Sequence, residues 1–558
     1  MAARRHARSR KIPTTTFRKE LLVVAALLFL ALAVRLYYFT GPTFANTQDE
    51  GIYYNIFLQG VVLHNYPHFT QYLGANFGDP DQGIFNPAVI PTFYSGLIYP
   101  EMFLLKTLGF SANLALYYVI LTSLVEGLFI YLILKEISGF RTAVISLLLF
   151  SFFPLNVMFA NRLEPLVPAA MFVTIASYIL IRSMKLRNRG EVATAGVLTG
   201  IFIGLGYLTN PLSLSLLVFL VLLMASGALR GVERPGWYAY RIALVVAGIG
   251  LVFSVSGVFY YMQSGNFLLY PTVDRIAAVN NLINQPVSTL AQIGGIKLVR
   301  LDVQPLFYLP IFFNYPSPQP YGSSYFSFLG YISAAAAVGL VLLRVRFARF
   351  FAGMLLLYFI LINFFPLASH ASGGATSVLL VYMEPMLLAL LTLPVIALSA
   401  LGIDYLLSRA EPELVAFGAA ILVAAIVMSV VNLNGDVMLP RSSMATVNAM
   451  ASFVQTVPNA TFYLNPYISG EVDVLTAHKY RVLPMTSCSS AYMEGIAQGN
   501  STYIAVGGTA NMDVDEQIIH SFSDCEAANL TAGSELVYTA NNPYMDEPEL
   551  QVYRLGAG

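Results

Sequence analysis

Two adjacent carboxylates, Asp49 and Glu50, follow the first apolar run of the chain by a few residues, and the aromatic Tyr53 comes soon after them. Holding a carboxylate close to hydrocarbon is energetically costly. Partial desolvation raises its pKa and therefore its basicity, so such a group can take a proton from a hydroxyl acceptor. The pattern predicts either a general base at a membrane boundary or an incidental acidic turn in a solvated loop.

A second acidic pair, Asp79 and Asp81, flanks Pro80 in the same loop. Two carboxylates that flank one residue can share a divalent cation through oxygen ligands. The spacing predicts a metal site here as one hypothesis, and a simple turn is the alternative that so short a pattern favours.

Arg162 and Glu164 come just after the outer end of the apolar run 142–160 and precede Pro165. The planar guanidinium of arginine donates two parallel hydrogen bonds to a phosphate or a carboxylate. The position therefore indicates an anion-binding group. The alternatives are an arginine that extends toward lipid headgroups or one that pairs with Glu164.

Further cations lie in polar segments on the same predicted side of the membrane. Arg275 and Arg300 belong to the segment 263–324, and His370 lies between two apolar runs. The two arginines are candidates for binding an anion. His370 could donate to a phosphate or bind a metal, although a lone histidine in a loop usually does neither.

The composition identifies the elements that must position these groups. Of the 558 residues 57% are hydrophobic and only 11% are charged, and the mean hydropathy is +0.67. A soluble protein carries about 25% charged residues, so a soluble enzyme, a disordered chain and a nucleic-acid binder are excluded. Runs long enough to span a bilayer predict a polytopic α-helical membrane protein with about eleven spans, near 21–40, 112–134, 142–160, 165–181, 191–208, 212–229, 242–262, 325–343, 350–368, 376–402 and 412–432.

The distribution of basic residues predicts the orientation. Residues 1–20 form a basic, cytoplasmic N-terminus, and the loops that then alternate to the cytoplasm hold most of the other lysines and arginines. The apolar segment 88–108 would invert this bias if it spanned, so we expect it to lie at the outer interface. The transmembrane domain is predicted over 21–434 with large external loops 41–111 and 263–324, the second containing an irregular, proline-rich lid over 302–322.

The polar remainder, residues 435–558, is predicted to be a small extracytoplasmic α/β domain. Strand-like runs cover 461–464, 480–483, 502–506, 535–539 and 550–555, with helical stretches near 444–456, 490–498 and 513–522. Three N-glycosylation sequons favour an external location, at Asn459, Asn500 and Asn529. Cys488 and Cys525 could form a disulfide there, and two free buried thiols are the alternative.

Taken together, these motifs resemble the integral-membrane glycosyltransferases of the GT-C superfamily, in particular the protein O-mannosyltransferase and lipid A aminoarabinose transferase group. The resemblance covers roughly residues 15–435. It rests on Asp49, Glu50 and Tyr53 after a first helix, on the proline-containing segment 85–94, on Arg162 and Glu164, and on the helix end 204–210. The order of these motifs and their shared outer side carry the resemblance.

The resemblance implies an inverting enzyme that transfers a sugar from a polyprenyl-phosphate donor to a hydroxyl acceptor on the extracytoplasmic face. Asp49 would be the general base and Glu50 would shape the site. The implied partners are membrane lipid, the lipid-linked sugar and a protein, lipid or glycan acceptor, with no nucleic acid. A divalent metal ion is a candidate cofactor.

The sequence also departs from that family. Asn86 and Asn210 stand where relatives often carry a cation, so the cations that bind the lipid phosphate are open. The oligosaccharyltransferase branch is disfavoured, because Trp237 is the only tryptophan and a Trp-Trp-Asp motif is impossible. A transporter or flippase of lipid-linked glycans and a non-catalytic scaffold are the alternative functions. External sequons suit an archaeal plasma membrane, which we favour, or an endoplasmic reticulum.

Overall fold

The computed structural model describes most of the chain. The described residues are 14–41, 71–72, 85–86, 95–186, 188–215, 235–264, 267–268, 287–293, 296–301, 308–313, 325–345, 347–364, 366–370, 376–380, 385–464, 466–477, 479–484, 501–507, 534–541 and 548–555.

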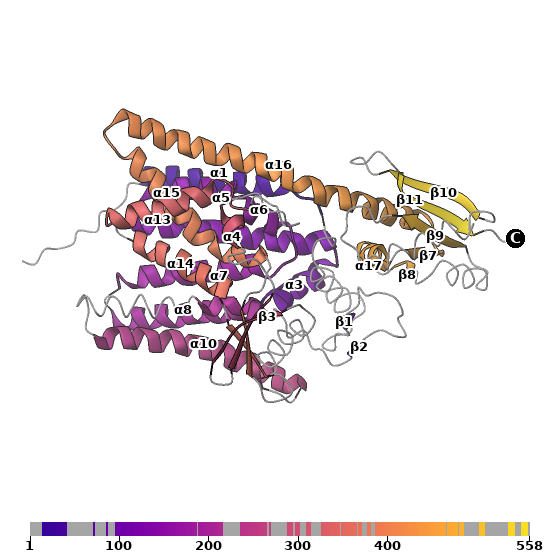
Figure 1. Cartoon of the computed structure of the whole chain (residues 1–558), viewed down its shortest axis with the longest axis horizontal. Coiled ribbons are helices and arrows are strands. Elements are labelled where there is room, and N and C mark those ends of the chain that lie inside the picture. The colour runs from indigo at the N-terminus through magenta and orange to yellow at the C-terminus, as the bar shows by residue number, and fades with distance from the viewer. Residues whose placement is uncertain are drawn as a thin grey trace, which may run out of the picture.

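A helical bundle forms the larger part of the molecule (Figure 1). Its helices are α1 (Thr14–Tyr37), α3 (Ser95–Leu108), α4 (Ala112–Ile137), α5 (Phe140–Ser151), α6 (Pro154–Ala160), α7 (Leu166–Ser183), α8 (Arg189–Thr209), α10 (Pro235–Ser264), α12 (Tyr308–Phe312), α13 (Leu329–Leu342), α14 (Ala348–Phe364), α15 (Thr392–Leu407) and α16 (Pro412–Thr456). Two short 3-10 segments, η2 (Pro211–Leu214) and η3 (Pro385–Leu391), join some of them.

Among the described residues, seven helices are long and apolar enough to cross a membrane, or eight if the bent pair α5 and α6 is one span. Ten of the eleven predicted spans contain a helix, and the span predicted at 212–229 lies mostly outside the described residues. The predicted number of eleven is therefore not confirmed, since α13 and α14 are shorter than a full span. The multi-pass helical character is confirmed.

The run 142–160 is not one straight helix. The axes of α5 and α6 differ by 55° at a break between Ser151 and Pro154. Proline at the first position of a helix is favoured, because it has no N–H to leave unsatisfied there. The N–H of Leu155 instead reaches the carbonyl oxygen of Tyr325, at 2.8 Å. The bend turns α6 back into the bundle and brings its side chains against α1 and α4.

Two glycines allow α8 and α10 to approach each other closely. A Cβ added to Gly200 would overlap the carbonyl oxygen of Val245 and lie 2.9 Å from Gly248 Cα. A Cβ on Gly248 would in turn overlap the carbonyl oxygen of Val197. Small residues at such a crossing let the two backbones pack against each other inside a membrane.

A four-stranded sheet lies where the sequence predicted external loop and spanning helix. Its strands are β3 (Val287–Ile293), β4 (Ile296–Leu301), β5 (Pro366–His370) and β6 (Thr376–Leu380), in the order β3-β4-β6-β5. The pair β4 and β6 is parallel and the other two pairs are antiparallel.

This sheet corrects three expectations. The predicted spans 350–368 and 376–402 run into residues that form strands, and the external segment 263–324 contains β3, β4 and the helix α12. The helix α12 also lies inside 302–322, so that proline-rich segment is not irregular throughout. A short apolar run reads alike as a buried strand or as part of a helix, which explains the error.

A five-stranded sheet forms the C-terminal part of the molecule. Its strands are β7 (Thr461–Leu464), β8 (Arg481–Pro484), β9 (Thr502–Gly507), β10 (Ser534–Asn541) and β11 (Pro548–Leu555), in the order β10-β11-β9-β7-β8. All five predicted strands are present, and the helix α17 (Pro466–Leu475) connects the parallel pair β7 and β8. A two-residue pair, β1 (Gln71–Tyr72) and β2 (Phe85–Asn86), completes the described strands.

The boundary predicted at 434/435 falls inside α16, which continues through it to Thr456. Figure 1 shows this helix extending past the bundle to the C-terminal sheet. The helical stretches predicted near 490–498 and 513–522 lie outside the described residues.

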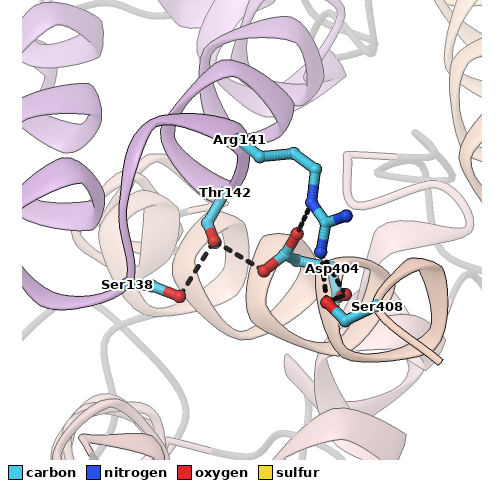
Figure 2. Close-up of polar contacts among 5 residues, drawn as sticks. All are labelled: Ser138, Arg141, Thr142, Asp404 and Ser408. Carbon is cyan, nitrogen blue, oxygen red and sulfur yellow. Dashed lines mark hydrogen bonds and ion pairs between the residues drawn. The ribbon is translucent and has the colours of Figure 1, made fainter.

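Among the described residues, one end of the bundle carries three ion pairs, two between helices and one from the turn after α7 to α4. Lys135 binds Glu20 at 2.7 Å, Lys185 binds Glu136 at 2.5 Å, and Arg141 binds Asp404 at 2.5 Å. Figure 2 shows the last pair, in which Asp404 also accepts a hydrogen bond from Thr142, at 2.8 Å. The three basic residues belong to the loops predicted to be cytoplasmic, and the structure brings these loops together.

Candidate active site

The opposite end of the bundle gathers the elements that carry the predicted site. The C-terminus of α1, the N-terminus of α4, the C-terminus of α6 and the N-terminus of α7 lie at this end, because successive spans alternate in direction. The helix α3 packs against the end of α8, where Gly96 lies against Thr209. The C-terminal sheet lies toward the same end (Figure 1).

Arg162 and Glu164 lie in the short turn between α6 and α7. The guanidinium carbon of the half-buried Arg162 stands 5.3 Å from the centre of the Phe159 ring, and this stacking restricts its orientation. The side chain of Glu164 is buried, with 1% exposed. It lies two residues before Leu166, the first residue of α7, whose N-terminal dipole stabilises a negative charge. The turn therefore carries one partly accessible cation and one buried acid.

Beneath this turn, a buried polar network joins α1, α4 and α6. Arg35 Nη2 donates to Asn156 Oδ1 at 2.6 Å, and Arg35 Nε donates to Ser123 Oγ at 2.7 Å. Asn156 Nδ2 donates to Glu126 Oε2 at 2.8 Å, which links the arginine to a carboxylate of opposite charge. All four side chains are at most 1% exposed. Such a network holds its members in one arrangement, because each buried charge would be costly without its partners.

The network also reaches the turn that carries Arg162. Asn161 Nδ2 donates to the carbonyl oxygens of Val157, at 3.0 Å, and of Arg35, at 3.4 Å. The end of α6 is thus tied to the end of α1. Because α1 leads directly to the loop with Asp49 and Glu50, the same contacts set where that loop leaves the bundle.

Arg35, Glu126 and Asn156 were not among the residues predicted from the sequence. A signal was present, since Arg35 and Glu126 are charged residues inside apolar runs, and such residues indicate a functional or paired group. Their pairing was not visible, because residues 35, 123 and 156 come together only through the bend between α5 and α6.

The structure places two other predicted cations in the four-stranded sheet. Arg300 lies on β4, in register with Ser288 of β3 and Leu380 of β6. His370 ends β5, opposite Thr376. The strand β6 thus separates their strands, and β4 and β5 are not direct neighbours.

The remaining predicted site residues are not tested by the structure. They lie outside the described residues: Asp49, Glu50, Tyr53, Asp79, Asp81, Arg275, Cys488, Cys525, Asn500 and Asn529. Asn459 is described, and it is exposed in the turn between α16 and β7. Within the part of the chain that the structure describes, no three His, Cys, Asp or Glu side chains gather as a metal site would require.

Comparisons with known proteins agree with this architecture. Residues 102–247, which include α4 to α8, match the family model of dolichyl-phosphate-mannose-protein mannosyltransferases. The crystal structure of ArnT from Cupriavidus metallidurans bound to undecaprenyl phosphate is similar, with a TM-score of 0.58 at 11% identity over 98% of this chain and 99% of that chain. A comparison with curated proteins found no match.

A second similar structure is the archaeal oligosaccharyltransferase AglB from Archaeoglobus fulgidus, in complex with an inhibitory peptide and a dolichol-phosphate. Its TM-score is 0.51 at 12% identity, over 95% of this chain and 75% of that chain. At such low identity the likeness shows a shared fold. The resemblance to the GT-C superfamily expected from the sequence is confirmed.

Proposed function

We propose that the protein is an inverting glycosyltransferase that moves a sugar from a polyprenyl phosphate to a hydroxyl acceptor on the extracytoplasmic side of a cell membrane. The observation that carries the proposal is the fold, which follows that of a polyprenyl-phosphate-bound protein over nearly the whole length of both chains. The match to the family model also supports the proposal, because the matched residues, 102–247, include Arg162 and Glu164.

In this proposal Asp49 is the general base. The described residues that follow α1 end at Gly41, which lies against Asn113 at the N-terminus of α4. Asp49 follows Gly41 by eight residues, so the chain can carry it no further than about 29 Å from that point. This reach supports a base at the end of the bundle that presents Arg162.

The reaction is a single displacement. Asp49 takes the proton of the acceptor hydroxyl while its oxygen attacks the anomeric carbon of the donor sugar. The bond from that carbon to the phosphate oxygen breaks on the opposite side, and the phosphate leaves on its lipid. Negative charge develops on the departing phosphate, where Arg162 donates hydrogen bonds to it. The ring of Phe159 beneath the guanidinium helps to hold Arg162 in place.

Glycan mass spectrometry of host cells that lack the protein tests this proposal. Re-expression of the wild type should restore one missing sugar, whereas Asp49→Asn should not, because an amide cannot accept the proton. A thermal unfolding curve of the purified Asn variant should match that of the wild type. If both the wild type and Asp49→Asn restore the missing sugar, Asp49 is not the base, and a transport or scaffold role becomes the favoured function.

A further inference from the structure

A polar cavity of about 350 Å³ lies between the bundle and the C-terminal sheet. The turn between α3 and α4 forms one wall, the last turn of α16 forms the second, and the turn after α17 forms the third. Groups able to recognise a ligand come from each wall: Phe110, Asn113, Gln455, Thr476, Lys479 and Tyr480.

The chemistry of the lining indicates the kind of ligand. Asn113 and Gln455 offer amides that both donate and accept, and their side chains are exposed. Phe110 and Tyr480 are half-buried aromatic rings, which present apolar faces. Amides beside aromatic faces suit a saccharide, whose hydroxyls need both donors and acceptors while its C–H faces pack on rings.

The charge of the lining further restricts the class of ligand that fits the cavity. Lys479 is the one charged side chain among the described residues that line the cavity, and it is exposed. No described carboxylate opposes it there, so a metal cation is disfavoured and an acidic group is favoured. The volume lies in the range of pockets for small ligands, roughly 300–1,000 Å³.

The position of the cavity connects it to the reaction. Asn113 contacts the region of Gly41, from which the chain continues to the loop with Asp49. The walls are also held by one continuous element, since α16 belongs to both the bundle and the C-terminal part. Resting on the function proposed above, we propose that this cavity binds the saccharide acceptor of the transfer and that Lys479 faces an acidic group on it.

Two matched probes test the proposal on the purified full-length protein in nanodiscs: methyl β-glucoside and methyl β-glucuronide, which differ by one carboxylate. Their dissociation constants are measured by saturation-transfer NMR. We expect both to bind, and the glucuronide more tightly by about threefold, as an exposed ion pair contributes. Lys479→Ala should remove this preference, and Asn113→Ala should weaken both probes. Arg554→Ala, which removes an exposed cation of β11 outside the cavity, should change neither.

Binding of neither probe would overturn the proposal. Equal binding by the wild type, Lys479→Ala and Asn113→Ala would also overturn it, because the probes would then sit elsewhere. Asp49→Asn separates this proposal from the catalytic one, because it is scored by sugar transfer and the cavity variants are scored by probe binding. Loss of probe binding in the cavity variants together with sugar transfer by Asp49→Asn would leave the cavity supported and the base assignment wrong.

Discussion

Individual buried charges in this protein fall into two kinds. Arg35 and Glu126 share a network in which each has a hydrogen-bonding partner. Glu101, on α3, is fully buried, and neither of its carboxylate oxygens has a hydrogen-bonding partner among the described residues. Burial raises the pKa of the Glu101 carboxyl well above its ordinary value, because an ionised group is poorly solvated there. Tyr118 of α4 is a described titratable residue that lies close enough to interact with it electrostatically.

The raised pKa of Glu101 predicts a pH-dependent stability. In the unfolded chain this carboxyl loses its proton near pH 4.5, whereas in the folded protein it keeps the proton to higher pH. The folded state then binds more protons, so the free energy of unfolding contributed by Glu101 falls as pH rises above about 4.5. Glu101→Gln removes this contribution, and its Tm relative to the wild type should be higher at pH 8 than at pH 5.

Thermal unfolding of the detergent-solubilised protein at the two pH values measures the effect. Glu413→Gln is the matched control, because Glu413 is exposed in the first turn of α16. It should show the same Tm difference at both pH values. An equal Tm difference at both pH values for Glu101→Gln as well would contradict the prediction.

At the scale of elements, the crossing of α8 and α10 depends on glycine. Gly200→Ala and Gly248→Ala each place a methyl group on backbone atoms of the opposite helix, which cannot turn aside as a side chain can. We expect each to lower stability by about 1–3 kcal/mol, the usual range for overpacking. Gly250, two residues along α10, has open space where its Cβ would lie. Gly250→Ala should be neutral or slightly stabilising, because alanine favours helix.

Thermal unfolding of the three alanine variants in one detergent checks this prediction. The two helix-interior glycines of α10 differ in their contacts and not in their secondary structure, so the comparison isolates the approach of the helices. Equal Tm values for Gly248→Ala and Gly250→Ala would show that the close crossing is not needed.

The elements differ in how far the sequence predicted them. Long apolar runs such as α4 and α8 were predictable, because a spanning helix needs about 20 apolar residues and little else has that pattern. The strands β5 and β6 were not, since their runs of five residues join apolar helices and extend the hydropathy signal. The strands of the C-terminal sheet were predictable because polar turns separate them.

The candidate site was predictable only in part, for a related reason. A local motif such as Arg162 followed by Glu164 can be seen in the sequence. The contact of Arg35 with Asn156 could not, because it joins residues 121 positions apart across a bend. The carboxylates of the loop 41–111, which is predicted to be external, remain predictions.

At the scale of the whole molecule, α16 decides how the C-terminal sheet meets the bundle. Its 45 residues extend over about 68 Å, roughly twice the thickness of a membrane core. Its first part, Pro412–Gly435, is apolar enough to span a membrane. The helix then extends past the bundle to the C-terminal sheet (Figure 1). The end of this helix packs on the sheet through Phe453, whose ring stacks on Tyr538 with centroids 4.6 Å apart.

Phe453 also meets Phe462 and Tyr503 edge to face, so one side chain contacts the strands β7, β9 and β10. Phe453→Ala should loosen the sheet from α16 while leaving the bundle folded, because a core phenylalanine contributes about 3–5 kcal/mol and this half-buried one less. Limited proteolysis should cut the C-terminal part faster, and the Tm of the bundle should be unchanged. The rate of proteolysis of Phe453→Leu, which keeps an apolar contact, should lie between those of the wild type and of Phe453→Ala.

Because the proposed saccharide cavity has walls on both parts, Phe453→Ala should also weaken binding of methyl β-glucuronide. Faster proteolysis with unchanged binding would show that α16 does not hold the cavity together.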